Sequence, residues 1–149
     1  MTELKKKILS EVEQLLEDKS TQMQQQLDAI REDASSSGKS SMGDKYETTR
    51  EMLKQEELKV AGQLALCDKQ LKQVRSVTGG TSEKVANGSL VRSSNLYFMI
   101  LTGIGKITID QKEIFVISAV APIAQQLLKR QVGDSFTFNG KPHQIDELV

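Results

Sequence analysis

Three carboxylates flank the small, polar segment 34–43 of this 149-residue chain and could together hold a metal ion. Glu32 and Asp33 precede the segment, and Asp44 follows it. A hard cation such as Mg²⁺ prefers oxygen ligands and is held poorly by one exposed carboxylate, so acids from both sides would have to meet. The spacing does not require this. The simpler role for Asp44 is to cap a following helix, with Glu47 as its capping-box partner.

The other residues that could take part in chemistry give weaker evidence of a functional role. Cys67 is the single cysteine, which excludes an internal disulfide, and its place in an apolar row predicts a small core residue. His143 has no second ligand at a suitable spacing, so we expect a surface or strand residue. Lys5, Lys6 and Lys7 form a basic cluster that we expect to be a solvated helix face. No metal site or cofactor of the chain's own is expected.

Two rows of apolar residues recur every seven positions in the first half of the chain. The first row is Leu9, Leu16, Met23 and Ile30, reinforced by Ile8, Val12, Leu15 and Leu27; the second is Leu53, Val60, Cys67 and Val74, with Leu64 and Leu71 between them. Only Glu57 interrupts the second row. Heptad spacing is typical of helices that pack side by side. We therefore expect an antiparallel hairpin of helices about 30 residues and on the order of 45 Å long, with a tip loop at 34–44.

The second half of the chain changes its apolar period twice. A strand is expected to end at 114–117, Pro122 suits the first position of a short helix over 123–129, and Gly133-Asp134 ends that helix. Phe136 and Phe138 then alternate with polar residues. Asn139-Gly140 favours a two-residue type I′ hairpin, with a return strand through Ile145. Upstream, 78–82 is expected to form a hinge.

The composition limits which partners and which cellular location can be expected. Twenty basic and twenty acidic side chains cancel, which argues against generic duplex binding driven by phosphate neutralisation. No apolar run reaches the roughly 20 residues needed to cross a bilayer, and the N-terminus is charged where a signal peptide would be apolar. We therefore expect a cytoplasmic protein without membrane contact.

The succession strand, Ile-Ser-x-x-Ala-Pro-Ile, short helix, Gly-Asp, strand, Asn-Gly and strand resembles the C-terminal domain of the bacterial Gre transcript-cleavage factors. Residues 85–91 also look like the first strand of that domain. With the helical hairpin, the resemblance covers nearly the whole chain. It implies an α+β fold with a coiled-coil finger at 1–76 and a small FKBP-like antiparallel sheet domain with a short helix at 77–149. One departure is Ala121, where the family usually has Ser; Ala cannot cap the helix, at a cost of roughly 1 kcal/mol.

The resemblance also implies a partner and a mode of binding. Gre factors pass the finger through the secondary channel of bacterial RNA polymerase, where acidic tip residues help to hold a second Mg²⁺ for hydrolysis of backtracked RNA. A monomer that acts on the polymerase and reaches the RNA 3′ end is expected, with no cofactor beyond the polymerase's own Mg²⁺. By the same resemblance, Pro122 and Ile123 would dock on the polymerase, and Arg50 and Lys54 would face the RNA.

The tip departs from the family in its chemistry. The family tip reads approximately Gly-Asp-Leu-Ser-Glu-Asn-Ala-Glu-Tyr, and residues 38–46 align with it without gaps. The tip residues are Lys39, Ser41, Met42, Gly43, Asp44 and Tyr46. Lys39 stands where the first metal-holding Asp belongs, and Met42 stands where the Glu belongs. Because an ammonium repels Mg²⁺ and a thioether binds it poorly, we expect a polymerase-binding regulator, not an enzyme, that does not stimulate cleavage.

Two alternatives remain open. The protein could be an active cleavage factor that uses Asp44 with Glu32, Asp33 or Glu47 as a displaced acidic pair. It could also be an FKBP-like peptide binder, since a fold does not determine its chemistry. The peptide-binding alternative is the weakest, because a proline pocket needs clustered aromatic residues. Tyr97, Phe98, Phe115, Phe136 and Phe138 are few and alternate regularly, as in a sheet core.

Overall fold

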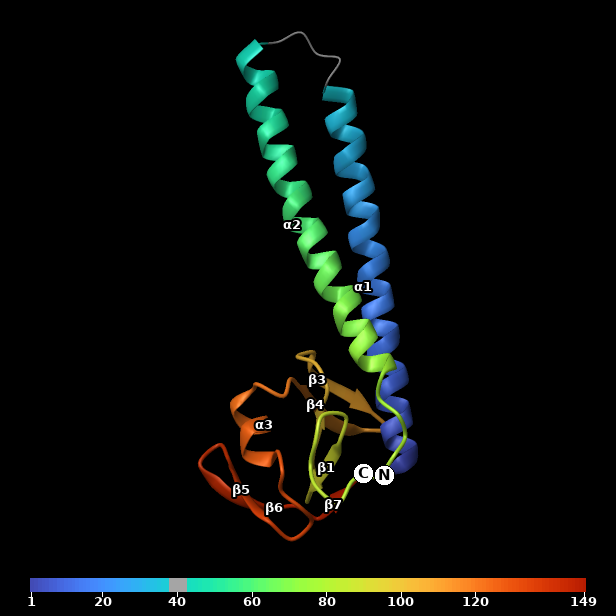
Figure 1. The fold of residues 1–149 in the computed structure, drawn as a ribbon, viewed down its shortest axis with the longest axis vertical. Helices are drawn as coiled ribbons and strands as arrows, with labels where there is room; N and C mark the ends of the chain where they lie inside the picture. Colours follow the sequence, from blue (N-terminus) through green and yellow to red (C-terminus); the bar gives the residue numbers. More distant parts are fainter. Residues whose placement is uncertain (38–42) are drawn as a thin grey trace. The chain divides into compact units, whose positions relative to one another are not determined.

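A computed structural model describes the backbone of residues 1–37 and 43–149, and the side chains of 1–35 and 47–149. Two long helices come first, α1 (Thr2–Ser37) and α2 (Gly43–Arg75), as Figure 1 shows. They are followed by β1 (Leu90–Ser93), β2 (Leu96–Ile100), β3 (Gly105–Ile109), β4 (Lys112–Ile117), α3 (Pro122–Leu127), β5 (Ser135–Phe138), β6 (Lys141–Gln144) and β7 (Glu147–Leu148). The expected order of a helical hairpin followed by a small sheet domain with a short helix is confirmed.

The chain forms two compact units. We call Gln14–Leu71 the helical unit, and Met1–Glu13 together with Lys72–Val149 the sheet unit. The beginning of α1 and the end of α2 thus belong with the strands. The expected domain boundary between residues 76 and 77 stays a prediction.

The helical unit is an antiparallel pair of helices (Figure 1), and apolar side chains are buried between them. The buried residues of the seam are Leu16, Met23, Leu27 and Ile30 from α1, and Val60, Cys67 and Leu71 from α2. The Cys67 thiol donates a hydrogen bond to the carbonyl oxygen of Leu16, with a sulfur–oxygen distance of 3.1 Å. Cys67 is therefore a core residue as expected, and burial raises the pKa of its thiol, which disfavours the reactive thiolate. Leu15, expected to reinforce the seam, is 41% exposed.

An ion pair between the helices accounts for the interruption of the second heptad row. Arg31 Nε of α1 lies 3.0 Å from Glu57 Oε1 of α2. The Glu57 side chain is 34% exposed, so the carboxylate reaches water as well as its partner. A charged residue is thus tolerated at a seam position because the opposite helix supplies the matching charge.

Both helices run further toward their connection than the sequence indicated. α1 continues through Ala34 to Ser37, and α2 begins at Gly43, so the expected loop 34–44 is too long at both ends. Alanine is a strong helix former and serine only a weak breaker, which allows α1 to continue. The helix start at Gly43 places Asp44 in the first turn, where a carboxylate suits the helix N-terminus. Asp44 therefore lies within the helix, and its expected place at the N-cap was wrong, because α2 begins one residue before it.

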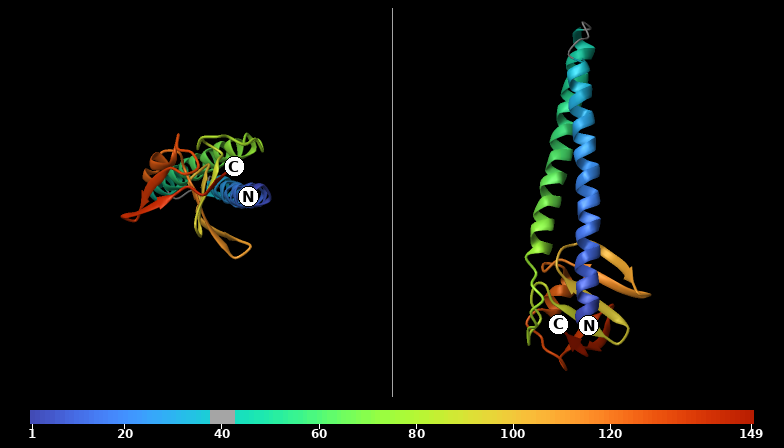
Figure 2. Two further views of the ribbon diagram at one scale, coloured as in Figure 1. Left: turned by 90° about the horizontal axis from the view of Figure 1, so that it is seen from below. Right: turned by 90° about the vertical axis from the view of Figure 1, so that its right-hand side faces the viewer.

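The sheet of the sheet unit is mixed, so the expectation of a wholly antiparallel sheet was wrong. Its strand order is β3-β4-β2-β1-β7, and β2 pairs with β4 in parallel, with Phe98 opposite Phe115. After β2, the chain passes to the sheet edge as β3. It then returns as β4, which lies between β2 and β3. Because β3 and β4 form a hairpin, visible in Figure 2, β4 then runs in the same direction as β2. Residues 101–104 provide this connection.

The first strand begins later than expected. Val85 is buried in the core, but β1 starts only at Leu90, because a turn intervenes. Gly88 has a φ of 89°, which is incompatible with a strand interior, and the Ala86 amide donates to Ser89 Oγ at 3.0 Å. The expected strand over 85–91 therefore consists of one buried residue, a turn and the first two residues of β1.

The core of the sheet unit is built around Phe98. Its ring centroid lies 5.5 Å from that of Phe115, 5.9 Å from Phe136 and 5.2 Å from Phe138. His143 of β6 stacks on Phe136 at 5.6 Å, which agrees with the expected strand residue. The alternating phenylalanines therefore pack on one another, as a sheet core does.

Two local predictions are confirmed at the ends of α3 and β5. The N-cap residue Ala121 makes no side-chain hydrogen bond to the helix, and Pro122 occupies the first helical position. Asn139 and Gly140 have φ values of 51° and 75°, as a type I′ turn between β5 and β6 requires.

The three lysines at the start of α1 have three different environments. Lys7 Nζ lies 2.7 Å from Asp110 Oδ2 in the turn between β3 and β4. Lys6 is 68% exposed and 3.4 Å from Glu3. Lys5 is only 5% exposed, so the expectation of a solvated face was wrong for this residue. Within the described residues, no helix has a long enough apolar stretch to cross a membrane.

Candidate functional site

A groove lies between the two helices of the helical unit, at the end where they are connected. Its volume is about 850 Å³, and its walls are Ala34 and Ser35 of α1 with Glu47, Arg50, Glu51, Lys54 and Glu57 of α2. The ion pair between Arg31 and Glu57 joins the two helices beside it. The groove lies next to the connection between the helices, which the sequence predicts to be the functional tip.

The α2 wall of the groove carries two rows of charge. Arg50 and Lys54 are four residues apart and so share one face of the helix, and the same holds for Glu47 and Glu51. All four side chains are exposed and line the one groove. The structure thus brings the two expected RNA-facing residues together. It also sets carboxylates beside them, which a phosphate backbone would avoid.

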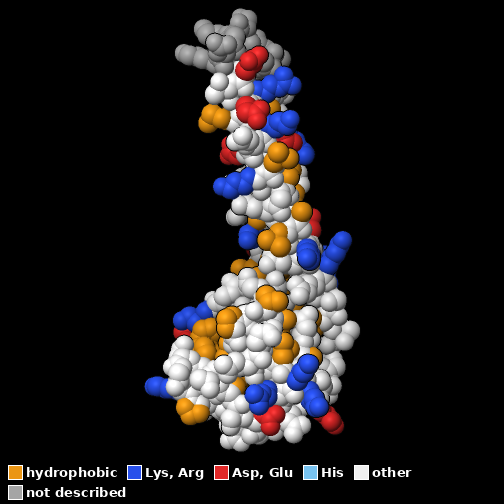
Figure 3. All heavy atoms as spheres, turned by 60° about the vertical axis from the view of Figure 1, so that its left-hand side comes forward, with side chains coloured by type: hydrophobic (Ala, Val, Ile, Leu, Met, Phe, Trp, Pro, Cys, Tyr) orange, Lys and Arg blue, Asp and Glu red, His pale blue; other side chains and the backbone are white. Residues whose placement is uncertain are grey.

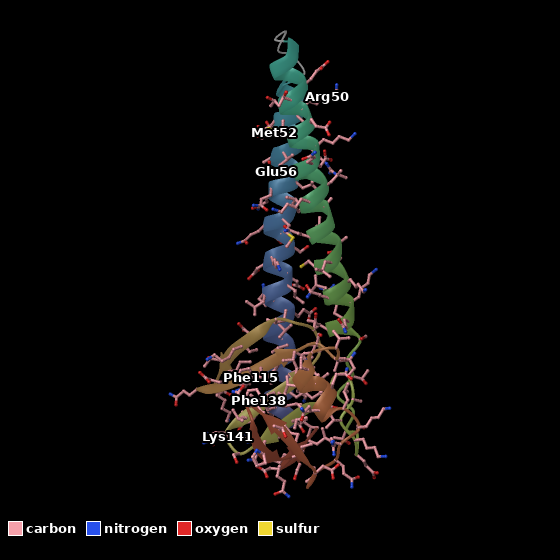
Figure 4. The ribbon with its side chains drawn as sticks, turned by 90° about the vertical axis from the view of Figure 1, so that its left-hand side faces the viewer. Arg50, Met52, Glu56, Phe115, Phe138 and Lys141 are labelled. Carbon is pink, nitrogen blue, oxygen red and sulfur yellow. The ribbon has the colours of Figure 1, made fainter. Side chains whose placement is uncertain are left out.

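The charge around the groove is mixed along the helices. Figure 4 shows Arg50, Met52 and Glu56 on this part of α2, and Met52 is 66% exposed. On the face seen in Figure 3, basic and acidic side chains alternate along the helices. Such a surface of mixed sign lacks the continuous positive charge that a nucleic-acid strand requires.

The acids on the α1 side do not enter the groove. Glu32 and Asp33 are exposed, and neither is among the described residues that line it. Among the described side chains, no three His, Cys, Asp or Glu residues gather closely enough to hold a metal ion. The displaced acidic pair would need Asp44, whose side chain is not described.

The central tip residues lie outside the described residues. These are Lys39, Ser41 and Met42. Gly43, Asp44 and Tyr46 are described in their backbone only, as the first residues of α2. Their roles stay predictions.

The expected docking surface lies at the start of α3 in the sheet unit. Pro122 is exposed, but Ile123 is half-buried and packs against the core cluster, so part of its side chain serves the fold. The more accessible apolar group is Val120, which is 83% exposed. The Gln125 amide donates to the Ala119 carbonyl at 2.7 Å, and the Val120 amide to Ser118 Oγ at 3.3 Å. These bonds hold the loop that presents Val120.

Sequence reasoning missed two of these residues. Val120 lies in a segment that was interpreted only as a break, and the available signal was a valine two residues before the proline. Arg31 was missed although Glu57, an acid within an apolar row, required a partner on the opposite helix. An interrupted heptad is therefore a usable signal for an interhelical ion pair.

No family model and no curated protein matches this chain. Among solved structures, it is similar to a crystal structure of GreA factor homolog 1 (Gfh1) of Thermus thermophilus. The identity is 19% and the TM-score 0.36, over 87% of this chain and 94% of that chain. A structure of the transcription factor Gfh1 shows 20% identity and a TM-score of 0.32, over 85% of this chain and 89% of that one.

Proposed function

We propose that this protein binds bacterial RNA polymerase, inserts its helical hairpin into the secondary channel and modulates elongation without stimulating RNA cleavage. The observation that carries the proposal is the antiparallel hairpin whose connection holds Lys39 and Met42, followed by a sheet unit with the Gre-like order of elements. A long arm that ends in a polar segment suits entry into a narrow channel. The sheet unit then serves as the docking part.

The chemistry of the connection supports the absence of cleavage. Hydrolysis assisted by a second Mg²⁺ needs oxygen ligands that neutralise the ion and hold it near the scissile phosphate. The ammonium of Lys39 would repel the ion at one expected ligand position, and Met42 offers only a thioether at the other. Occupation of the channel without this ion makes the protein a competitor of cleavage factors.

The exposed apolar step at the start of α3 supports the docking role. Val120 and Pro122 present apolar surface to solvent, while Ile123 and the bonds of Ser118 and Gln125 hold it in place. Burial of a small, pre-organised apolar surface against a partner contributes favourably to the free energy of binding. We assign Val120 and Pro122 as the contact with the polymerase, with Ile123 as their support.

A second candidate function is transcript cleavage through displaced acids. It is favoured by one observation: Glu32 and Asp33 are exposed on the last turns of α1, close in sequence to the connection. With Asp44 they would supply the carboxylates that positions 39 and 42 lack. A peptide-binding function is disfavoured, because Phe98, Phe115 and Phe138 pack on one another in the core.

The deciding experiment is a cleavage assay on a backtracked elongation complex with a labelled RNA 3′ end. The unmodified protein should bind the complex and leave the RNA uncleaved. It should also slow cleavage driven by an authentic Gre factor in proportion to its occupancy of the channel. Lys39→Asp combined with Met42→Glu should create Mg²⁺-dependent cleavage, and each single change should do much less because both ligands act on one ion.

The matched control for this experiment is Asp44→Asn. If the displaced acids act, the unmodified protein will stimulate cleavage strongly and Asp44→Asn will abolish it. If the protein neither binds the complex nor competes with a Gre factor, the proposed function is wrong.

A further inference from the structure

A smaller cavity lies within the sheet unit, where the start of α1 meets the segment that leads into β1. Its volume is about 320 Å³. The groups that bear on its chemistry are the side chains of Lys5, Ser76, Thr78, Thr81, Ser82 and Ser89. No carboxylate is among the described residues that line it. The cavity therefore combines one cation with several hydroxyl groups.

Lys5 is buried without a partner for its charge. Its side chain is 5% exposed, and its ammonium makes no hydrogen bond or ion pair with the described residues. No side-chain nitrogen or oxygen among the described residues is both fully enclosed and without a hydrogen bond, so the Lys5 ammonium reaches solvent, and Lys5 is one of the residues that line the cavity. Burial lowers the pKa of Lys5, the effect expected of an ammonium that no anion compensates. The nearby Lys7, in contrast, has Asp110.

The walls offer hydrogen-bond donors. Ser89 Oγ accepts a bond from the Ala86 amide and Ser82 Oγ accepts one from the Lys84 amide, so both hydroxyl hydrogens stay available. The backbone amides of Thr78 and Thr81 make no hydrogen bond to the described part of the chain. Both residues are exposed, so a ligand from solvent can reach this segment.

We infer that this cavity binds an oxyanion of the phosphate class, with Lys5 as the charged contact and the hydroxyl and amide groups of residues 78–89 as further donors. A cation without a local acid, surrounded by donors, is complementary to a tetrahedral group of acceptor oxygens. A carboxylate ligand would use fewer of these donors. The group is either free phosphate or the phosphate of a nucleotide, and both present the same oxygens. The inference does not depend on polymerase binding.

The test uses the full-length protein at neutral pH, with sodium phosphate compared with sodium chloride at equal ionic strength. Bound phosphate stabilises the folded state, so the melting temperature should rise in phosphate only. Lys5→Met keeps the length of the side chain, should melt no lower than the unmodified protein in chloride, and should lose the phosphate-dependent rise. Its phosphate affinity should fall by about tenfold or more. Lys6→Met removes the same charge from an exposed neighbour and should keep the full response.

Adenosine monophosphate distinguishes the two sources. Tighter binding than inorganic phosphate would assign a nucleotide, and equal binding would assign the phosphate group alone. An equal phosphate response in Lys5→Met and the unmodified protein would overturn the inference. If Lys5→Met does not fold, the Lys5 side-chain resonance of the unmodified protein decides. Phosphate must shift this resonance and chloride must not; a resonance that does not move contradicts the site.

Discussion

At the scale of single residues, the neighbouring lysines of α1 show how position decides chemistry. Lys6 and Lys7 are both exposed, yet only Lys7 has a partner distant in sequence, Asp110. The hydrogen bond from Lys7 holds the pKa of the Asp110 carboxyl below its usual range, and the same bond raises the pKa of Lys7. The pair links the start of α1 to the β3–β4 turn within the sheet unit.

This pair predicts a stability coupling that depends on pH. In a double-mutant cycle of Lys7→Gln and Asp110→Asn, the interaction should stabilise the sheet unit at neutral pH. A lowered carboxyl pKa contributes stability above the ordinary carboxyl range, and this is lost as the pH falls through the lowered value. A raised lysine pKa contributes stability below the ordinary lysine range, and this is lost as the pH rises through the raised value. Unfolding followed by circular dichroism measures the coupling.

The exposed pair of Lys6 with Glu3 is the control for this cycle. These residues lie on one helix and are 68% and 81% exposed, so solvent screens their attraction. Their coupling should be the smaller of the two at neutral pH. A Lys7–Asp110 coupling that stays constant into strong acid would contradict the role of the carboxylate.

At the scale of elements, the helical unit depends on its seam. Leu16 is 2% exposed and contacts Cys67 through its backbone, whereas its neighbour Leu15 is 41% exposed. Leu16→Asp should destabilise the hairpin by several kcal/mol, because it places a charge without a partner in an apolar contact. Leu15→Asp should cost much less. Loss of helicity on heating, followed by circular dichroism, should separate the two variants; equal melting would contradict the seam.

The hairpin of β5 and β6 depends on its turn. Gly140 has a φ of 75°, and an alanine Cβ there would meet no neighbouring atom, so the cost of substitution is backbone strain alone. Gly140→Ala should destabilise the sheet unit by about 1–2 kcal/mol. Gly103→Ala is the matched control, because that position is equally open and has no positive φ. Urea unfolding should show a lower midpoint for Gly140→Ala only.

At the scale of the whole molecule, polymerase binding should depend on the apolar step beside α3. Val120 is 83% exposed, so Val120→Asp should leave the fold unchanged and weaken binding to RNA polymerase by about tenfold or more. Val132→Asp introduces the same charge at a valine that is 54% exposed and lies apart from the step in sequence. It should bind as the unmodified protein does. Fluorescence anisotropy with labelled full-length protein measures both, and equal affinities would move the docking surface elsewhere.

The sequence by itself determined the features that depend on neighbouring residues. Heptad spacing predicted the helical hairpin, because an apolar row must be buried against a second helix. Asn139-Gly140 predicted its turn, because few residues adopt a positive φ. Ala121 predicted an uncapped helix, because it lacks a side-chain acceptor. The chemistry of positions 39 and 42 was also read from the sequence alone, and it remains for the cleavage assay to test.

Only the tertiary structure decided the features that join distant segments. β4 enters the sheet between β3 and β2, a choice of strand order that no local pattern contains. The same holds for the pairing of Arg31 with Glu57 and for the burial of Lys5 beside residues 76–89. A lysine in a basic run has the same local pattern whether it faces solvent or a cavity. Its environment is decided by which segments pack around it, and that packing reflects the free energy of the whole unit.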